Sequence, residues 1–529
     1  MTAPHSAAGD RVPDCDVLIV GAGPVGQVSA LLLAQQGLQV VVLERWEKPY
    51  PLPRAVALAH DVVRVLHTLG MGDRLTHLLE PWGHAGQELL LESSDGERLT
   101  KSEVSLTSLS GHPQMSSFSQ PDLELLLEDR VHEVDVIDQR RGATVRSLRS
   151  RSDRVDVTAV SDDQTEFVLS ARYVVGCDGA NSLVRQQIGA PVNDLQFDRD
   201  WMVVDVVPRT PLTGAMRNIG QRLGPGRPTT FVAAGPNRRR FEFMIMPGED
   251  AVELDTDDAT WKLLQPWGFD PTNSELVRHA LYTFRARWAT RWRAGRILLA
   301  GDAAHQMPPF LGQGLNSGIR DAANLAWRLA LVVKGTTPDS LLDDYVGERN
   351  DQVTTIVRET VTMGGLICTT DPEEANRRDE FLKQVGRMDV HTDWPLHTGT
   401  LGEGPAAGTL GLQARVGIAN RIGLLDGLLS NGGKFTLLGA CTDPVALLDP
   451  ALAAGWSELG GVGGHFGPGG WTDVDSEYAN WFDALNARVV LIRPDFHVFG
   501  TSSGDQASTN VLVGNLLNRT RTEFAQREA

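Results

Sequence analysis

The pattern of apolar and polar positions near the start of the chain predicts a β–α–β unit. A short apolar run at 16–20 (DVLIV) is followed by the glycine-rich turn 21–26 (GAGPVG), a helical pattern over 27–36 and a second apolar run at 39–45 (QVVVLER). Short runs without alternation are typical of strands buried on both faces, and Gly37 ends the helix between them. Such a unit, of about 30 residues, is the smallest element of a parallel sheet.

Beyond this unit, helical and strand-like patterns alternate. The chain is predicted to form a helix over 61–70, two strands around the Asp95–Gly96 turn, and another helix starting at Gln120. A strand followed by glycines near residue 175 repeats the arrangement of the first turn. These elements indicate a mixed α/β region rather than an all-helical one.

The pattern changes three times in the rest of the chain. From 191 to 292, short alternating segments such as WMVVDVV and RRFEFMIMPG predict a separate, mainly β layer. The α/β style returns over 293–395, and the glycine-rich passage 396–410 is predicted to be a linker. The strand-like runs GKFTLLGA and RVVLIRPDFHVFG then predict a third domain over 411–529.

Composition excludes several classes of partner. The formal net charge is -18 and the acidic residues are spread along 529 positions, so neither a nucleic acid nor an anionic membrane surface is expected to bind. No apolar run reaches the roughly 20 residues of a spanning helix, and 1–13 is predicted to be a short disordered lead. The four cysteines form no CxxC pair. We therefore expect no metal site, buried thiols and a cytoplasmic protein.

The turn at 21–26 matches the pattern G-x-G-x-x-G. Gly21 is expected to make the tight turn, Gly23 to let a pyrophosphate approach the backbone, and Gly26 to let the helix pack on the sheet. Glu44 ends the second strand about 20 residues later, where a carboxylate accepts hydrogen bonds from ribose hydroxyls. Because strand, turn, helix and acidic residue occur together, a dinucleotide site is favoured over a purely structural turn.

Several helix-breaking residues stand directly before one of the clearest helical patterns of the chain. The segment GDAAHQMPPFLGQG begins at Gly301 after the apolar run RILLA, and a helix follows whose apolar positions recur from Leu315 to Val333 at spacings of four and three. Asp302 therefore lies at the carboxyl edge of a strand and is expected to bind a ribityl hydroxyl. The free amides of the helix start near Gly314 are expected to stabilise the negative charge of a reduced flavin.

Three other positions are less distinctive. Arg54 taken alone is best interpreted as a solvated surface arginine, but its place in a proline-rich loop soon after Glu44 favours a position near the cofactor, and Gln120 is undistinguished by itself. Asp178 ends a strand in YVVGCDGANSLVR. A cap for the following helix explains this aspartate as well as a ligand contact does.

Three motifs in this order resemble the single-component FAD-dependent aromatic hydroxylases: the 21–26 turn with Glu44, CDG at 177–179 and GDAAH at 301–305. The segments PLPRAVAL, QPDLE, RPTTFVAAGPNRRRFEFMIMPGED and LIRPDFHVFG extend the likeness over about 14–500, and the nearest subgroup looks like the 3-(3-hydroxyphenyl)propionate and polyketide-tailoring hydroxylases. The resemblance implies a Rossmann-like α/β FAD-binding domain at 14–190 and 293–395, a β-layered substrate domain at 191–292 and a C-terminal thioredoxin-like domain at 411–529. Since that last domain has no CxxC pair, we expect it to be structural or to contact a second subunit in a homodimer.

The resemblance also implies which residues form the site. Together with the motif residues above, the positions expected to bind the cofactor are Gly21, Gly23, Pro24, Gly26, Glu44, Arg45, Arg54, Gln120, Asp178, Asp302, Pro309, Gly312, Gly314, Leu315 and Asn316. Pro309 and the backbone of 312–315 are expected to line the flavin ring where oxygen reacts. Activation of a phenol requires a group that takes or shares its proton. The catalytic candidates are His305, which lies beside the flavin loop, and Arg240, which could pair with a substrate carboxylate. The alternatives are that His305 only holds the loop together and that Arg240 is solvated.

The implied reaction is an aromatic hydroxylation. NADH or NADPH reduces FAD, oxygen adds to give a flavin hydroperoxide, and the distal oxygen attacks a phenolic or polycyclic aromatic ring. Only one complete dinucleotide fingerprint is present, so NAD(P)H is expected to dock transiently over the flavin. The alternatives are an FAD oxidase or dehydrogenase, and a non-catalytic binding protein on the same fold.

Overall fold

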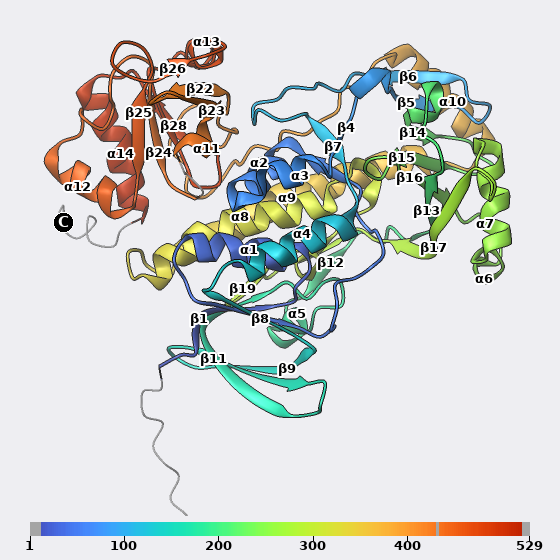
Figure 1. Cartoon of the computed structure of the whole chain (residues 1–529), viewed down its shortest axis with the longest axis horizontal. Helices are drawn as coiled ribbons and strands as arrows, with labels where there is room; N and C mark the ends of the chain where they lie inside the picture. The colour runs from blue at the N-terminus through green and yellow to red at the C-terminus, as the bar shows by residue number, and fades with distance from the viewer. Residues whose placement is uncertain (1–11, 430–432, 521–529) are drawn as a thin grey trace, which may run out of the picture.

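Two long helices, α8 (Gly314–Val333) and α9 (Leu341–Ile367), lie at the centre of the molecule between three larger parts (Figure 1). This computed structural model describes residues 12–429 and 433–520. The predicted disordered lead, 1–13, lies outside the described residues apart from its last two positions. No helix of the described ranges has the length and apolar character needed to cross a membrane.

The β–α–β unit predicted from the first apolar runs is the middle of an eight-stranded sheet. Its strand β1 (Cys15–Val20) lies between β2 (Val40–Glu44) and β11 (Glu166–Gly176) and runs parallel to both. Two more parallel strands, β8 (Ile137–Arg141) and β20 (Ile297–Leu299), extend the sheet on either side. This order confirms the predicted Rossmann-like α/β fold, in which ligands bind at the carboxyl ends of the strands.

The helices that cover this sheet are α1 (Pro24–Gln35), α4 (Gln120–His132) and α8, and α1 packs against both of the others. The predicted apolar positions of α8 are buried from Ile319 to Val333, and Leu315 at the start of the helix is half-buried. Its polar face is buried as well, including Asp321 and Arg328. An amphipathic helix ordinarily leaves its polar face in water. Here α9 packs against that helix, and ionic partners from α9 and the C-terminal part surround its polar side chains.

A seven-stranded, mainly antiparallel sheet forms the predicted β layer, at the right of Figure 1. In spatial order its strands are β17 (Ser274–Phe284), β13 (Arg199–Pro208), β16 (Arg239–Met244), β15 (Thr229–Ala233), β14 (Ile219–Arg222), β5 (Leu89–Glu92) and β6 (Arg98–Ser102). The last two form the hairpin predicted around Asp95–Gly96. The sheet therefore combines two strands that precede β11 in the chain with five strands that follow it. One face packs against α7 (Asp257–Leu264), and the other faces the loop before α8.

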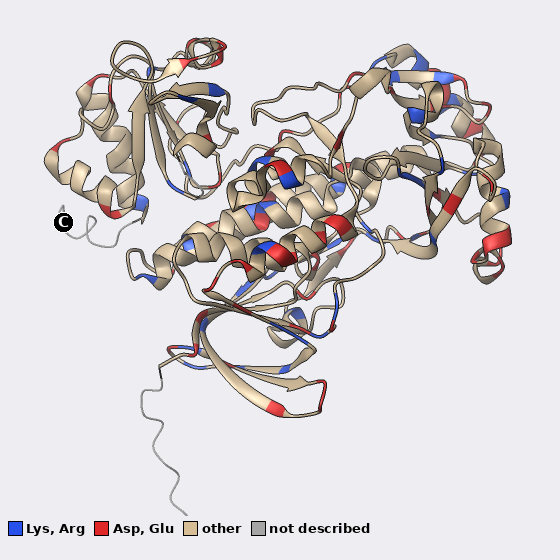
Figure 2. Ribbon diagram, viewed as in Figure 1, with Lys and Arg blue, Asp and Glu red and all other residues tan. Residues whose placement is uncertain are grey.

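The C-terminal part contains a four-stranded sheet in the order β25 (Val462–His465), β24 (Thr436–Gly439), β27 (Val489–Ile492) and β28 (Val498–Ser502). The first pair is parallel and the other two pairs are antiparallel, with α12 (Pro450–Glu458) between β24 and β25 and α14 (Gln506–Thr520) after β28. This is the arrangement of a thioredoxin-like domain, as predicted. Acidic and basic residues are interspersed over this and the other two parts (Figure 2).

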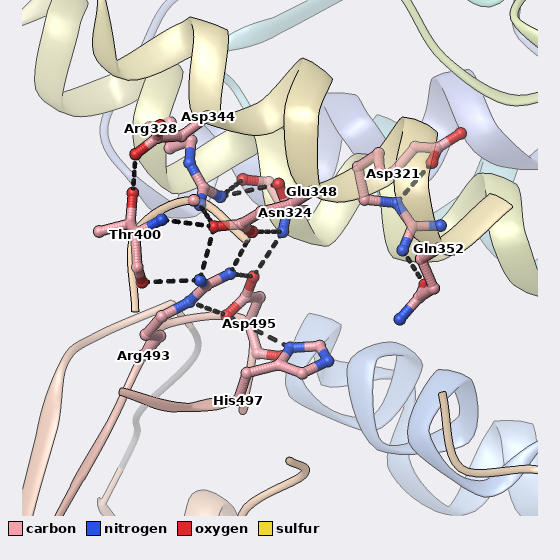
Figure 3. Close-up of polar contacts among 12 residues, drawn as sticks. Asp321, Asn324, Arg328, Asp344, Glu348, Gln352, Thr400, Arg493, Asp495 and His497 are labelled. Carbon is pink, nitrogen blue, oxygen red and sulfur yellow. Dashed lines mark hydrogen bonds and ion pairs between the residues drawn. The ribbon is translucent and has the colours of Figure 1, made fainter. Parts of the chain in front are cut away.

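A cluster of buried charges joins the C-terminal part to the two central helices (Figure 3). Glu348 on α9 accepts hydrogen bonds from Arg328 of α8 at 2.6 Å and from both terminal nitrogens of Arg493 at 2.8 Å. Arg493 also pairs with Asp495, and Asn324 of α8 donates to both Glu348 and Asp495. Burial acts to raise the pKa of Glu348, but the attraction of the two guanidinium groups outweighs it and lowers that pKa. The C-terminal part is therefore held by fully paired buried ions.

We expect Arg493→Ala to lower the free energy of unfolding by about 3–5 kcal/mol, because it leaves the buried carboxylate of Asp495 without a guanidinium and leaves Glu348 with Arg328 as its one remaining guanidinium partner among the described residues. Differential scanning calorimetry of the purified variant measures the loss. The matched control is Arg488→Ala, whose exposed ion pair with Asp483 contributes only about 0–1 kcal/mol. An Arg493 variant as stable as this control would show that the cluster does not hold the parts together.

Candidate functional site

The 21–26 turn has the shape that a pyrophosphate requires. Gly21 has a φ of +105°, and a Cβ there would lie 2.4 Å from the carbonyl oxygen of Cys177. A Cβ on Gly26 would lie 2.0 Å from the carbonyl oxygen of Gly21, whereas nothing lies within 4 Å of the Cβ position of Gly23. The turn is thus closed on the protein side and open at the middle glycine, where α1 starts with Pro24 and without a side-chain cap. Its free first amides fit a phosphate group.

Glu44 braces this turn from the next strand. One carboxylate oxygen accepts a hydrogen bond from the amide of Ala22 at 2.8 Å, and the other accepts one from the amide of Trp46 at 3.0 Å. Each oxygen retains a lone pair, so the carboxylate still fits a ribose hydroxyl. The neighbouring Arg45 is exposed, with its guanidinium carbon 5.2 Å from the centre of the Trp46 ring.

Asp178 reaches the same turn from β11. Its carboxylate accepts hydrogen bonds from the Ser182 hydroxyl at 2.5 Å and from the Val184 amide at 3.1 Å, so it supports the first turn of helix α5 (Leu183–Gln187), whose N-cap is Ser182. These contacts give the side chain a structural role at the start of the helix. Its backbone lies directly over the pyrophosphate turn, because a Cβ on Gly21 would be 3.1 Å from its Cα.

The loop that carries Arg54 is fixed from two sides. Gln120 is buried, and its side-chain oxygen accepts a hydrogen bond from the amide of Ala55 at 2.7 Å. Arg240 donates to the carbonyl oxygens of Pro53 and Arg54. The Arg54 side chain itself is exposed, with its guanidinium carbon 4.0 Å from the centre of the Tyr50 ring. Gln120 is therefore not an undistinguished helix residue, since it positions the loop that carries the arginine.

The structure contradicts both expectations for Arg240, a solvated side chain and a partner for a substrate carboxylate. Its residue is only 2% exposed, and two of its nitrogens donate to the carboxylate of Asp205 at 2.8 and 2.9 Å. Because that carboxylate neutralises the guanidinium and two backbone carbonyls accept its other hydrogen bonds, the side chain is neither solvated nor free to bind a substrate carboxylate. It positions the loop at 53–54 instead.

The GDAAH loop lies beside the pyrophosphate turn. Gly301 has a φ of +61°, and a Cβ there would be 3.1 Å from Val25 in the first turn of α1. The side chain of Asp302 is exposed to solvent. The surrounding protein raises the pKa of its carboxyl group by desolvation, against the opposing charges of His305 and Arg54. The two cofactor motifs, far apart in sequence, are therefore adjacent in space, and the second of them carries an accessible carboxyl group.

His305 is not placed for proton transfer to a substrate. Its side chain is fully buried, its Nε2 lies 2.7 Å from the carboxylate of Asp321, and its ring stacks on Trp292. Asp321 also accepts hydrogen bonds from the amide of Gly301 at 2.9 Å and from Arg349 at 2.8 Å. The interpretation that His305 holds the loop together is correct, and the catalytic one is wrong because the ring has no access to the site.

The loop at 309–314 contacts the segment at 57–59 and, through Phe310, the seven-stranded sheet (the substrate sheet). Gly312 has a φ of +64°, and a Cβ there would lie 3.3 Å from Ala57. Asn316 accepts a hydrogen bond from the amide of Ala59 at 2.9 Å and donates to the carbonyls of Ala57 and Gly312. Its side chain is therefore used within the protein, which leaves only its backbone to contact a cofactor. Helix α8 starts here without a side-chain cap, so its amides point into the loop.

Sequence reasoning did not single out Asp321 or Arg349. Both lie inside strongly helical patterns, where a charged residue is ordinarily solvated. Among the described residues, no group of three or more histidine, cysteine, aspartate and glutamate side chains could hold a metal ion. The hydrogen bonds of Asp321 and Arg240 to loop amides and carbonyls show that these charged groups fix the backbone.

Comparisons with known proteins agree with this arrangement. Residues 14–360 match the FAD binding domain family, and 408–514 match the HcaD C-terminal domain. A probable NADH-specific resorcinol 4-hydroxylase of Rhodococcus jostii RHA1 is 35% identical over 500 residues, which is 92% of this chain and 91% of that protein. A 3-(3-hydroxy-phenyl)propionate/3-hydroxycinnamic acid hydroxylase of Escherichia coli K12 is 31% identical over 516 residues, with the same shares covered.

Among solved structures, a ternary complex of aklavinone-11 hydroxylase with FAD and aklavinone has a TM-score of 0.79 and 25% sequence identity, covering 96% of this chain and 99% of that one. The similarity therefore extends over the FAD-binding, substrate and C-terminal parts together.

We expect Gly26→Ala to abolish retention of FAD, because its Cβ would overlap the carbonyl oxygen of Gly21 and push α1 away from the turn. The ratio of flavin to protein absorbance after purification measures this. Gly427→Ala is the matched control, because nothing lies within 4 Å of its Cβ position. A yellow Gly26 variant with a normal flavin content would contradict the role assigned to the turn.

We expect Asp321→Asn to lower both stability and FAD affinity, because it leaves the buried Arg349 without a counter-charge and removes one acceptor from the Gly301 loop. The cost to folding is about 3–5 kcal/mol, the range for breaking a buried ion pair. Thermal unfolding with and without added FAD measures both effects. If the variant lost stability but bound FAD with unchanged affinity, the carboxylate would not position the loop.

Proposed function

The chain belongs to the FAD binding domain family and is an FAD-dependent aromatic hydroxylase, and from this premise we propose that its substrate is a single-ring phenol and its electron donor NADH. Three loops support it: the 21–26 turn packs against the loop at 301–305, and the loop at 309–314 contacts the substrate sheet through Phe310. This last contact is the observation that carries the proposal. The overall reaction balances as phenol, O2, NADH and a proton giving a dihydroxylated ring, water and NAD⁺.

Each of these loops is suited to one part of the cofactor. The amides of the 21–26 turn suit the pyrophosphate, Glu44 a ribose and Asp302 a ribityl hydroxyl. The amides of the backbone at 312–315 and the partial positive charge of the α8 start suit the negative charge of the reduced ring. Bound FAD supplies the redox chemistry, taking electrons from NADH and delivering one oxygen atom of O2 to the aromatic ring.

An aromatic contact favours a small substrate. Phe310, which follows Pro309 in the loop, lies 5.7 Å from Trp201, 6.0 Å from Phe284 and 6.1 Å from Phe197 between ring centres. These rings bring the loop and the substrate sheet into direct contact on one side. Such a wall excludes water from the reacting ring and limits its size. The relatives that act on resorcinol and hydroxyphenylpropionate support the same choice.

The test is the oxidation of NADH and of NADPH by the yellow protein with resorcinol, 3-(3-hydroxyphenyl)propionate or a polycyclic phenol. We expect a single-ring phenol to raise the rate of NADH oxidation at least tenfold, which corresponds to about 1.4 kcal/mol. We also expect ¹⁸O from ¹⁸O2 to appear in the product. A product without ¹⁸O would indicate an oxidase or dehydrogenase. A response to the polycyclic phenol alone would show that the substrate is larger, and failure to take up FAD would favour a binding protein.

A further inference from the structure

Glu242 is a buried acidic residue that the arrangement described so far does not use. It lies on the central strand β16 of the substrate sheet, opposite Val203 of β13 and Thr230 of β15. Side chains on neighbouring strands at paired positions share a face of the sheet. The pairing therefore places Glu242 on the same face as Arg240 and Met244, and opposite to the face where Phe241 and Phe243 pack against α7.

The rows on either side of Glu242 contact the two loops of the cofactor site. On one side, Trp201 and Met244 form an apolar cluster that includes Phe310 and Ile367. On the other side, Arg240 donates to the backbone of Pro53 and Arg54. Glu242 thus occupies the row between the loop at 309–314 and the loop that carries Arg54. A phenol between the flavin ring and the sheet would lie over this row.

Among the residues that the structure describes, none forms an ion pair with the carboxyl group of Glu242. The residue is 5% exposed and forms no ion pair within the described ranges, because the guanidinium of the nearest arginine, Arg240, is bound to Asp205. The Thr230 hydroxyl, which donates to Gln221 at 2.7 Å, lies beside it. Burial raises the pKa of Glu242 to about 7; Arg240 opposes the rise and Asp205 adds to it. A carboxyl group with a pKa near the working pH suits general acid–base catalysis.

We propose that Glu242 is the catalytic base that takes the hydroxyl proton of the phenol. This inference rests on the proposed function. In the step, the phenol O–H bond breaks, an O–H bond forms on the Glu242 carboxylate, and the electron pair stays on the phenol oxygen, which makes the ring a better nucleophile. The proton returns to solvent or to the product after the ring is hydroxylated, so the residue is regenerated.

The other charged groups near Glu242 have hydrogen-bond partners elsewhere, although Arg278 has no carboxylate partner among the described residues. Asp205 binds Arg240, and Arg278 on β17 donates to the Pro53 carbonyl and to the Tyr282 hydroxyl. The groups that face Glu242 from the loop at 309–314 and from α9 are apolar, including Phe310 and Ile367. A single acidic pH limb is therefore expected, because Glu242 is the group on this face whose ionisation lies near neutrality.

The experiment compares wild type, Glu242→Gln and Glu242→Asp with resorcinol and NADH between pH 5.5 and 9, a range of about 1.5–2 units on either side of neutrality. For wild type, we expect kcat/KM to rise with pH through about 7, because the base acts only when ionised. For Glu242→Gln, we expect the high-pH value of kcat/KM to fall by about 10²–10³-fold, and we expect kcat/KM no longer to change with pH near 7. Glu242→Asp keeps a carboxylate that reaches less far, so an intermediate rate with the acidic limb retained is expected.

The matched control is Glu275→Gln, an exposed glutamate of β17 in the same sheet, with an expected rate equal to wild type. FAD content and product formed per NADH show whether each variant is folded and coupled. If Glu242→Gln does not fold, loss of the limb in Glu242→Asp overturns the proposal. A folded Gln variant with wild-type kcat/KM and an unchanged limb also overturns it. If the wild type hydroxylates no phenol, the proposed function fails and the role of Glu242 fails with it. If the wild type is active but the Glu242 variants behave like it, only the role of Glu242 fails.

Discussion

The carboxylate of Asp321 is the group on which the arrangement of the cofactor site depends. From the middle of α8 it accepts hydrogen bonds from the Gly301 amide and from Arg349 of α9, and it pairs with His305. Burial acts to raise its pKa, but the charges of His305 and Arg349 lower it below the ordinary value. One ionised group therefore fixes the loop after β20 to both central helices, and Asp302 in that loop is placed beside the pyrophosphate turn.

The buried cluster around Glu348 and Arg493 involves the same polar face of α8 that carries Asp321. Asp321, Asn324 and Arg328 are three and four residues apart, which places them on one side of α8. The first holds the cofactor loop, and the other two bind Glu348 and the C-terminal part. Buried ions add little net stability, since desolvation offsets much of their attraction. Their consequence is geometric, because they define one register between α8, α9 and the C-terminal part. That gives a thioredoxin-like domain without a CxxC pair a role that needs no redox chemistry.

The sequence predicted best those features that are local in the chain. The 21–26 turn, the strands on either side of it and the start of α8 follow from glycine spacing and apolar period, and each forms as predicted. The interpretation of Arg240 as solvated was wrong because its partner, Asp205, comes from a neighbouring strand 35 positions away. His305 failed as a catalytic candidate for the same reason, since the carboxylate that binds it is on another element. Charge pairing between strands and helices has no period that a single sequence displays.

The Arg240–Asp205 pair explains how an arginine and a carboxyl group with a raised pKa coexist on one face of β16. Glu242 lies two residues from Arg240, so both side chains project from the same face. If Asp205 were absent, the guanidinium would have Glu242 as its nearest acidic partner, and an ion pair would hold that carboxylate ionised at all working pH values. With Asp205 present, Arg240 is neutralised and its remaining donors bind the backbone at 53–54. The same interaction that fixes the loop beside the cofactor therefore leaves the adjacent carboxyl group free to gain and lose a proton.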